Sequence, residues 1–296
     1  MLRDHPPIVQ PKMSDVVKTK MSGFEGTLNA QQQDALAELK RLLEASEFAE
    51  DVRNHPDGDQ WVLRFLRATM KDKHGDRVFD AQAAEARMKR TLKWRRDNGA
   101  DDIMRSLMEG TPKAPEGYYD ICKASIPFEV LVNPADGTIF RYDRFGAGAS
   151  QVDESALTLE QWSRCVAFTM ESMLHTMREQ SKIHGREIST YFTLVDVSGI
   201  SLSGIVARRK FVQFMSDIGA EHYPETLGKT WLCNSPWYFS KIWAMVKPFI
   251  DKDTQMKLIV HSSVPVEDVL KYLPKALLLK EFGGENESVT LPHVKT

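Results

Sequence analysis

The sequence predicts an α/β fold in which a helical amino-terminal lobe precedes a lobe built on a mostly parallel sheet. Three observations lead to this class. Leucines recur at spacings of three and four from Leu36 to Leu43, which is typical of a helix. Residues 128–142 read as strand, turn and strand, with Asp136 and Gly137 as the turn signal. From residue 159 onward, helical and strand-like segments alternate, which favours parallel pairing.

Composition divides the chain into four regions. Residues 1–27 are rich in Pro, Lys and Ser and lack apolar periodicity, so we expect a mobile tail. Residues 28–110 are expected to form the helical lobe and residues 111–288 the α/β domain. Residues 289–296 are expected to be a second tail.

Within the helical lobe, residues 61–68 form a short amphipathic pattern that ends at a polar break. The break, residues 71–76, is expected to be a loop. Asp80 can cap a following helix that ends near Asn98, before a glycine.

The α/β domain is expected to contain one strand buried on both faces. Residues 190–197 are almost continuously apolar, as in the interior of a parallel sheet. Further helices are expected at 159–180, 203–218, 239–249 and 265–273, and further strands at 230–234 and 257–261.

Charge and cysteine content exclude several classes of protein. The net charge of −2 gives no general attraction to nucleic acid or to an anionic membrane, so no nucleic-acid partner is expected. Cys122, Cys165 and Cys233 lack the spacing of a zinc site or a disulfide framework, and we expect free thiols in a reducing compartment.

No apolar run reaches about 18 residues, and the first 20 residues lack the apolar core of a secretory signal. The expected location is the cytoplasm.

Catalytic motifs are weak in this sequence. The run from Gly228 to Thr230 resembles the end of a phosphate-binding loop, but Tyr223 stands where that loop needs a glycine. His175 lies near Glu171 and His184 near Glu187, as pairs on helix surfaces often do. We therefore expect no catalytic residues, no metal and no cofactor.

Methionines gather on the helix expected at 159–180. Methionine is flexible and adapts to irregular apolar partners, so Met170 and Met173 are candidates to line a ligand cavity. Ordinary core packing explains the same spacing equally well.

The segment 234–251 carries bulky apolar residues nearly all round a short helix. Such a helix is either deeply buried or faces an apolar surface outside the protein. Trp and Tyr favour membrane interfaces, and Lys241 and Lys247 can reach lipid head groups from apolar stems. The residues concerned are Trp237, Tyr238, Phe239, Ile242, Trp243, Met245, Val246, Phe249 and Ile250.

Over residues 55–285 the sequence resembles the Sec14-like (CRAL-TRIO) phosphatidylinositol transfer protein family. Each mark of the resemblance is weak alone, but they occur in the family's order and spacing. They are Leu63-Arg-Phe-Leu-Arg-Ala68, Trp94-Arg-Arg96, Thr193-Leu-Val-Asp196, Gly199-Ile-Ser201, Tyr223-Pro-Glu225, Gly228-Lys229, Asn234-Ser-Pro236, Lys247-Pro-Phe-Ile-Asp251 and Glu281-Phe-Gly-Gly284.

The resemblance implies a helical lobe and a CRAL-TRIO lipid-binding lobe whose sheet floors an apolar pocket. A gate helix covers that pocket and moves at a membrane, so peripheral membrane association is expected. By position the gate is residues 239–249. Its membrane-contacting side chains would be Trp237, Tyr238, Phe239, Ile242, Trp243, Val246 and Phe249.

The resemblance also implies a head-group site for phosphatidylinositol at Glu225, Thr254 and Lys257. Lys257 can pair with the phosphate, Thr254 can donate to it, and Glu225 can accept from inositol hydroxyls. The family's usual Arg-Lys pair after the Leu-Arg-Phe-Leu-Arg-Ala segment is absent, because Thr69 follows with the inserted residues 71–76. Arg77 is a candidate replacement.

Members that also bind phosphatidylcholine use a serine and tyrosines in the pocket. Here Tyr191 stands at the serine, and Arg141 and Met170 stand at two tyrosines, so a choline lipid is not expected. The residues expected to line the apolar cavity are Met170, Met173, Tyr191 and Thr193.

Three functions follow from this resemblance. The first is a carrier that holds one phosphatidylinositol and exchanges it at membranes without covalent chemistry, the phospholipid being a ligand and not a cofactor. The second is a carrier or sensor of a sterol, tocopherol, retinoid or haem, in a cavity reshaped by Tyr191, Phe192 and Met170. The third is a lipid-sensing monomer that engages a partner enzyme, for which a lipid kinase is a candidate.

Overall fold

The computed structural model describes residues 23–73, 76–125, 127–146, 153–250 and 252–287. The chain divides into two compact units, Met1–Arg90 and Thr91–Thr296, and the division falls inside helix α5 (Ala81–Asn98). The sequence placed this boundary after residue 110. The structure assigns α6 (Ala100–Met108) to the second unit, because Ile103 and Leu107 share an apolar cluster with Trp162 of α8 (Leu159–His184).

The amino-terminal unit is helical, as predicted. Helix α2 begins with a capping box in which Asn29 and Gln32 satisfy each other's backbone N–H groups. Leu39, Leu43 and Leu63 are fully buried and contribute to the core. The elements of this unit are α2 (Ala30–Glu44), α3 (Ala49–Arg53), α4 (Gly58–Ala68), β1 (Lys71–Lys73), β2 (Asp76–Val78) and the first part of α5.

In the polar break that was expected to be a loop, Lys71–Lys73 forms a strand that pairs antiparallel with a second strand, Asp76–Val78. Lys71 pairs with Val78 in the register of β1 and β2. Phe79, directly after β2, is buried, and Lys71 forms an ion pair with Asp80 at 2.8 Å. These contacts fix the end of the strand pair, a long-range effect that local polarity does not reveal.

The second unit contains a five-stranded sheet in the order β3-β4-β5-β6-β7. The first pair is antiparallel and the remaining three pairs are parallel, which confirms the predicted mostly parallel sheet. The strands are β3 (Phe128–Val132), β4 (Ile139–Asp143), β5 (Tyr191–Asp196), β6 (Leu227–Cys233) and β7 (Leu258–Val260).

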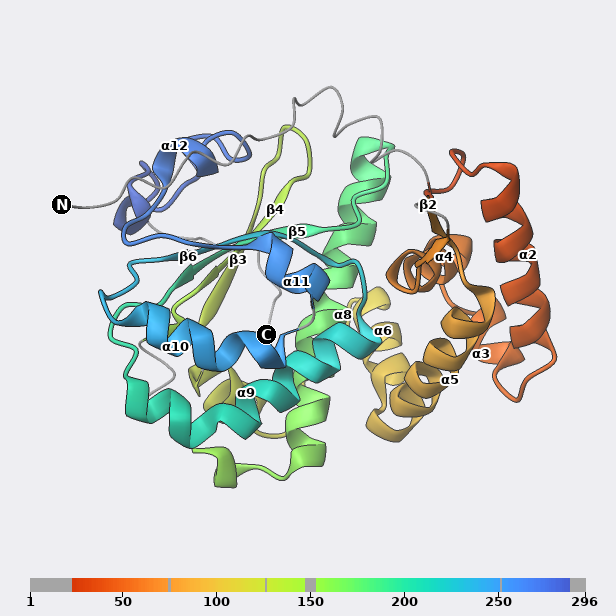
Figure 1. Cartoon of the computed structure of the whole chain (residues 1–296), viewed down its shortest axis with the longest axis horizontal. Helices are drawn as coiled ribbons and strands as arrows, with labels where there is room; N and C mark the ends of the chain where they lie inside the picture. Colours follow the sequence, from red (N-terminus) through yellow and green to blue (C-terminus); the bar gives the residue numbers. More distant parts are fainter. Residues whose placement is uncertain (1–22, 74–75, 126, 147–152, 251, 288–296) are drawn as a thin grey trace. The chain divides into compact units, whose positions relative to one another are not determined.

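Helices cover both faces of this sheet (Figure 1). On one face, α8, α9 and α10 pack against apolar side chains of β4, β5 and β6. On the other face, Phe140, Leu194 and Trp231 pack under α12 and the segment that follows it. The helices of this layer arrangement are α9 (Leu202–His222), α10 (Phe239–Val246), α11 (Lys252–Lys257) and α12 (Val266–Val269), with short helical turns at Tyr118–Lys123, Glu154–Ala156, Lys247–Phe249 and Lys280–Phe282.

Strand β6 contains a bulge that sets which of its side chains face α8. Tyr191 pairs with Leu227, but Thr193 pairs with Thr230, so β6 holds one extra residue between these pairs. Gly228 lies in the bulge, where a Cβ atom would come 2.9 Å from the Tyr191 carbonyl oxygen. A glycine is therefore required for the two backbones to approach this closely.

Candidate functional site

The turn after α9 presents Glu225 at the edge of the sheet where β6 begins. Pro224 cannot continue the helix, and Glu225 has a φ of 60°, in the left-handed region that side chains rarely adopt. The hydroxyl of Thr226 donates to the Tyr223 carbonyl at 2.8 Å, and the Tyr191 N–H donates to the Thr226 carbonyl at 3.0 Å. These bonds hold Glu225 in its uncommon conformation.

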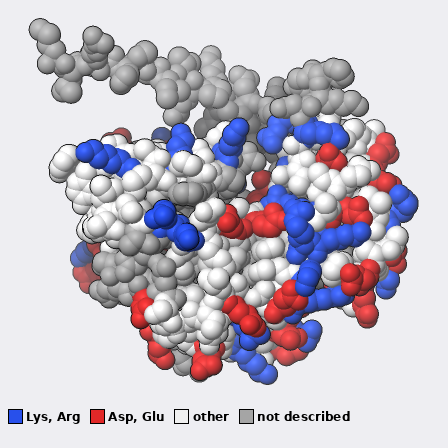
Figure 2. All heavy atoms as spheres, turned by 60° about the horizontal axis from the view of Figure 1, so that its bottom comes forward, with Lys and Arg blue, Asp and Glu red and all other residues white. Residues whose placement is uncertain are grey.

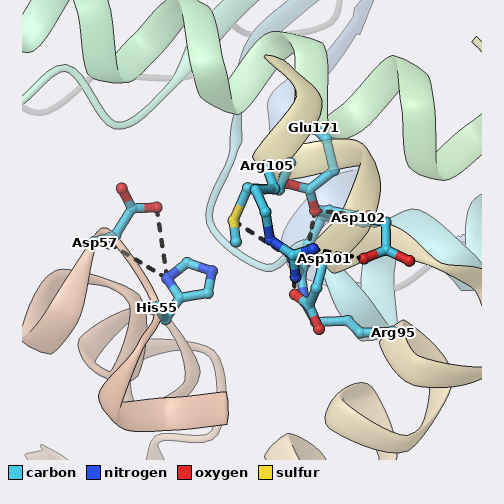
Figure 3. A network of polar contacts seen from close by, with 9 residues as sticks. His55, Asp57, Arg95, Asp101, Asp102, Arg105 and Glu171 are labelled. Atoms are coloured by element: carbon cyan, nitrogen blue, oxygen red, sulfur yellow. Dashed lines mark hydrogen bonds and ion pairs between the residues drawn. The ribbon is translucent and has the colours of Figure 1, made fainter. Parts of the chain in front are cut away.

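A buried polar network fixes the first residue of this turn. The Tyr223 hydroxyl donates to Glu171 at 3.1 Å, and Arg95 donates to the same carboxylate oxygen at 2.6 Å. Arg95 also reaches Asp101 at 2.6 Å, so its guanidinium lies between two carboxylates (Figure 3). Burial and the Glu171 carboxylate raise the pKa of Tyr223 well above its usual value, so the phenol remains a donor.

The sequence did not reveal this network. The sequence pattern places Glu171 among acids on a helix surface, whereas the structure shows it fully buried and paired with Arg95. Glu171 follows Met170 and precedes Leu174 by three residues, so it belongs to the apolar stripe of α8. This position in the stripe is the feature of the sequence that indicates a buried charge. A charged residue in such a stripe needs a buried partner.

Thr254 and Lys257 lie on α11, a short helix that the sequence did not predict. Both side chains are partly buried. The side-chain amide of Gln255 donates to the carbonyls of Lys247 at 2.9 Å and Ile250 at 2.7 Å, which ties α11 to the preceding turn.

The predicted head-group residues precede neighbouring parallel strands. Glu225 lies just before β6, and Lys257 immediately precedes Leu258, which pairs with Thr230 of β6. Helix α11 also contacts β6. Because parallel strands begin at the same edge of a sheet, Glu225, Thr254 and Lys257 belong to segments that meet at one edge.

Arg77 is exposed on β2 in the amino-terminal unit, whereas Glu225 belongs to the second unit. Its participation in the head-group site stays a prediction.

Three of the four predicted cavity residues pack together in the core. Met170 and Met173 of α8 share one apolar cluster with Tyr191 of β5. Thr193 is equally buried and lies on the same face of β5 as Tyr191. Phe192 points to the opposite face, where it stacks on Phe140 at 5.4 Å between ring centres. The expectation that Phe192 reshapes a cavity beneath the gate is therefore wrong, because side chains alternate between the faces of a strand.

The predicted gate is a helix with a buried face and an exposed face. Phe239 and Ile242 are buried against residues of α9 and of the loop after β5, and the Tyr238 hydroxyl donates to the Ile200 carbonyl at 2.8 Å. Trp243 and Val246 are partly buried at the border of this contact.

Trp237 lies two residues before α10 and outside the buried face of the gate, and its side chain is 87% exposed. The helix α10 ends at Val246, and a tighter turn continues to residue 249 because Pro248 supplies no N–H to the helical pattern. The Phe249 side chain lies outside the described set.

The segment that resembled a phosphate-binding loop is part of strand β6. Lys229 forms an ion pair with Asp268 of α12, and the Trp231 indole donates to the same carboxylate oxygen at 2.7 Å. Thr230 faces the opposite side of the sheet, toward α8. The segment is therefore structural, which agrees with the interpretation from the sequence.

The described residues also bear on two other features, metal sites and membrane spans. No group of three or more His, Cys, Asp or Glu side chains there is arranged to hold a metal ion. None of the described helices combines the length and apolar character needed to cross a membrane.

Comparison with known proteins identifies a domain in this chain and several relatives. The sequence profile of the CRAL/TRIO domain matches residues 147–284. The chain is 29% identical over 268 residues to the SEC14 cytosolic factor of Kluyveromyces lactis, a match that covers 90% of this chain and 82% of that protein. The chain contains a CRAL/TRIO domain and is similar to Sec14 cytosolic factors over most of its length. CRAL/TRIO proteins bind and transfer lipids, so lipid binding is the general function of the fold described above.

Two further comparisons agree with this assignment. The Sec14 cytosolic factor of Schizosaccharomyces pombe is 26% identical over 263 residues, covering 88% of this CRAL/TRIO chain and 85% of its own length. The crystal structure of Sfh5 superimposes with a TM-score of 0.63 and 14% identity, covering 88% of this chain and 89% of that one. At this identity the likeness to Sfh5 concerns the fold alone.

Proposed function

We propose that this CRAL/TRIO protein holds one phosphatidylinositol molecule and exchanges it at membrane surfaces, without covalent chemistry and without a cofactor. The relatives named as Sec14 cytosolic factors support the proposal and suggest a cytoplasmic location with transient membrane contact. The observation that carries the proposal is the constrained turn that presents Glu225 at the edge of the sheet where α11 carries Thr254 and Lys257.

The chemistry of these three side chains suits an inositol phosphate. A lysine pairs with phosphate as a point charge, a threonine hydroxyl donates, and a carboxylate accepts from ring hydroxyls. The turn is fixed by Tyr223 and by the buried Glu171, so Glu225 need not be ordered when ligand binds. Prior ordering of this kind reduces the entropic cost of binding.

Membrane contact is proposed for the start of the gate. Trp237 is 87% exposed, and Lys241 lies on the exposed side of α10. Over the face drawn in Figure 2, basic and acidic side chains are interspersed, so no uniform basic field stands out there. Local contact by an aromatic side chain and neighbouring lysines is therefore a better account than general charge attraction.

The test is transfer of labelled phosphatidylinositol between vesicles by wild-type protein, Glu225→Ala and Lys257→Ala. Each substitution removes one partner of a polar head group and is expected to lower the transfer rate roughly 5–150-fold, the effect of about 1–3 kcal/mol. Lys252→Ala is the matched control, because Lys252 is exposed at the other end of the same helix. Equal transfer rates for the wild type and both site variants would reject the head-group assignment.

A second function, carriage of another hydrophobic ligand, is favoured by Tyr191. This bulky side chain stands where choline-lipid binders have a serine and is packed against Met170 and Met173. If this function is the true one, a non-phospholipid should compete with phosphatidylinositol for the protein in the same transfer assay.

A further inference from the structure

Two of the three cysteines meet where the short helical turn Tyr118–Lys123 packs on α8. Cys122 lies on the turn and is 7% exposed, whereas Cys165 lies on α8 and is fully buried. Both side chains belong to the apolar cluster around Trp162, and both thiols are free. The sequence gives no sign of this proximity, because the two residues are far apart along the chain and share no motif.

Contacts one helical turn away show how the two cysteines come to face each other. The Tyr118 hydroxyl lies 3.2 Å from the Thr169 hydroxyl, and the centre of the Tyr118 ring lies 4.6 Å from that of Phe168. Cys122 follows Tyr118 by four residues, and Cys165 precedes Thr169 by four. Residues four apart lie on nearly the same face of a helix. One turn along each element therefore leads from the Tyr118–Thr169 contact to the two thiols, which hydrogen-bond to each other.

The hydrogen bond between the thiols changes their acidity in opposite directions. It raises the pKa of Cys122 and lowers the pKa of Cys165, because the first thiol keeps its proton and donates it to the second as a thiolate. Burial opposes the ionisation of both groups. A thiolate is the form of cysteine that reacts with oxidants, so reaction is favoured at Cys165, with Cys122 beside it to form a second bond.

The turn that carries Cys122 is the element able to move during such a reaction. Helix α8 spans 26 residues and begins with a capping box, whereas Tyr118–Lys123 is a π-helix of six residues. A π-helix is rare and seldom exceeds one turn, so few backbone hydrogen bonds oppose its displacement. Tyr119 on the same turn is 51% exposed. The thiols therefore lie beneath a short surface element, within reach of a small oxidant.

We propose that Cys122 and Cys165 form an oxidation-sensitive pair that hydrogen peroxide converts to a disulfide. The inference is independent of the proposed lipid cargo. In a reducing compartment the pair would stay as two thiols, and a rise in peroxide would join the turn to α8 by a covalent bond.

The reaction needs no group beyond the two thiols and the peroxide. The Cys165 thiolate attacks one peroxide oxygen, the O–O bond breaks, and the leaving hydroxide takes up a proton to become water. The Cys122 sulfur then attacks the sulfur of the resulting sulfenic acid and loses its proton, while the S–O bond breaks and releases a second water. Two thiols are thus oxidised by two electrons in total, and one peroxide is reduced to two waters.

The experiment treats the folded, full-length protein with hydrogen peroxide, removes the oxidant, and alkylates the remaining thiols after unfolding. Before alkylation the chain is expected to lose about 2 Da, the mass of two hydrogen atoms, and dithiothreitol should restore its mass. Peptide mapping should find Cys122 joined to Cys165, with Cys233 alkylated. Cys233 is the matched internal control, because it is also fully buried but its thiol donates to the Val195 carbonyl at 3.4 Å.

Two further controls separate native geometry from general thiol reactivity. Oxidation in urea should give a mixture of pairings that includes Cys233, so a single pairing in the folded protein reports the contact of the turn with α8. Cys122→Ala and Cys165→Ala should each form no intramolecular disulfide when folded. Three thiols that stay free in the folded wild type, pairings that include Cys233, or over-oxidation of one cysteine without a cross-link would each overturn the inference.

Thermal unfolding gives a second readout. A disulfide between residues 122 and 165 restrains the unfolded chain, so oxidised wild type should melt roughly 5–15 °C above the reduced protein. Cys122→Ala should melt at one temperature before and after peroxide treatment. An oxidised wild type that melts at or below the temperature of the reduced protein would mean that the fold does not place the two thiols for bonding, and would also overturn the inference.

Discussion

At the scale of single residues, the central feature is the buried charge that anchors the Tyr-Pro-Glu turn. Arg95 and Glu171 are 1% and 0% exposed in their side chains and lie 2.6 Å apart. Such a pair stabilises little by itself, but removing one member leaves an uncompensated charge in the interior. The Arg95–Glu171 pair fixes the position of Tyr223 and, through the turn, that of Glu225.

Glu171→Ala is therefore expected to lower the free energy of unfolding by about 3–5 kcal/mol, because Arg95 would stay buried without its strongest partner. Urea denaturation measures this as a lower midpoint at unchanged slope. The control is Lys93→Ala, which removes the exposed pair of Lys93 with Asp97 and should cost less than about 1 kcal/mol. A similar midpoint for both variants would contradict the account of the network.

A second residue-scale prediction concerns Asp268. Partial burial raises the pKa of this carboxyl, but hydrogen bonds from Lys229 and Trp231 outweigh it and lower the pKa to about 2. A carboxylate whose folded pKa lies below its unfolded value of about 3.9 stabilises the fold above that pH. This contribution is lost as the pH falls toward the folded pKa.

Between about pH 4 and pH 2, the wild type is thus expected to lose more stability than Asp268→Asn, which has no carboxyl to protonate there. Thermal unfolding across this window measures the difference. Parallel curves for the two proteins would show that Asp268 is not held in its charged form by Lys229 and Trp231.

At the scale of elements, patterns in the sequence were informative where one helix or strand has a clear apolar period. Strand β5 was predicted from its continuous apolar run, and α8 from its recurring methionines and leucines. Helix α11 was missed because Lys252–Lys257 contains Met256 as its single large apolar residue, and that side chain is 73% exposed. Its position depends on hydrogen bonds from the Gln255 side chain to carbonyls of the preceding turn, which the spacing of apolar residues does not encode.

The exposed side chain of Trp237, at the start of the gate segment, predicts how strongly the protein binds to membranes. Trp237 contributes little to the core because it is 87% exposed. Trp237→Ala should therefore weaken partitioning onto phospholipid vesicles by roughly 5–30-fold, the effect of about 1–2 kcal/mol, while thermal stability changes little.

Cosedimentation with vesicles measures this partitioning. Ile183→Ala is the matched control, since Ile183 is a 68% exposed apolar residue at the end of α8, outside the proposed membrane contact. If the two substitutions weaken vesicle binding equally, the gate has no special part in membrane contact.

At the scale of the whole molecule, the order of helices and strands identified the fold, and the family comparison confirmed it. The candidate site was predictable only through resemblance, because Glu225, Thr254 and Lys257 look like ordinary surface residues when each is taken alone. The buried network under Glu225 could not be predicted, because its partners come from α5, α8 and the turn after α9, which only the fold brings together.

The most direct test of the central claim is mass analysis of the lipid that copurifies with the intact protein. The account predicts one phosphatidylinositol per chain, and loss of that lipid from the Lys257→Ala protein. A sterol, another hydrophobe or a phospholipid with a different head group as the dominant bound species would contradict it.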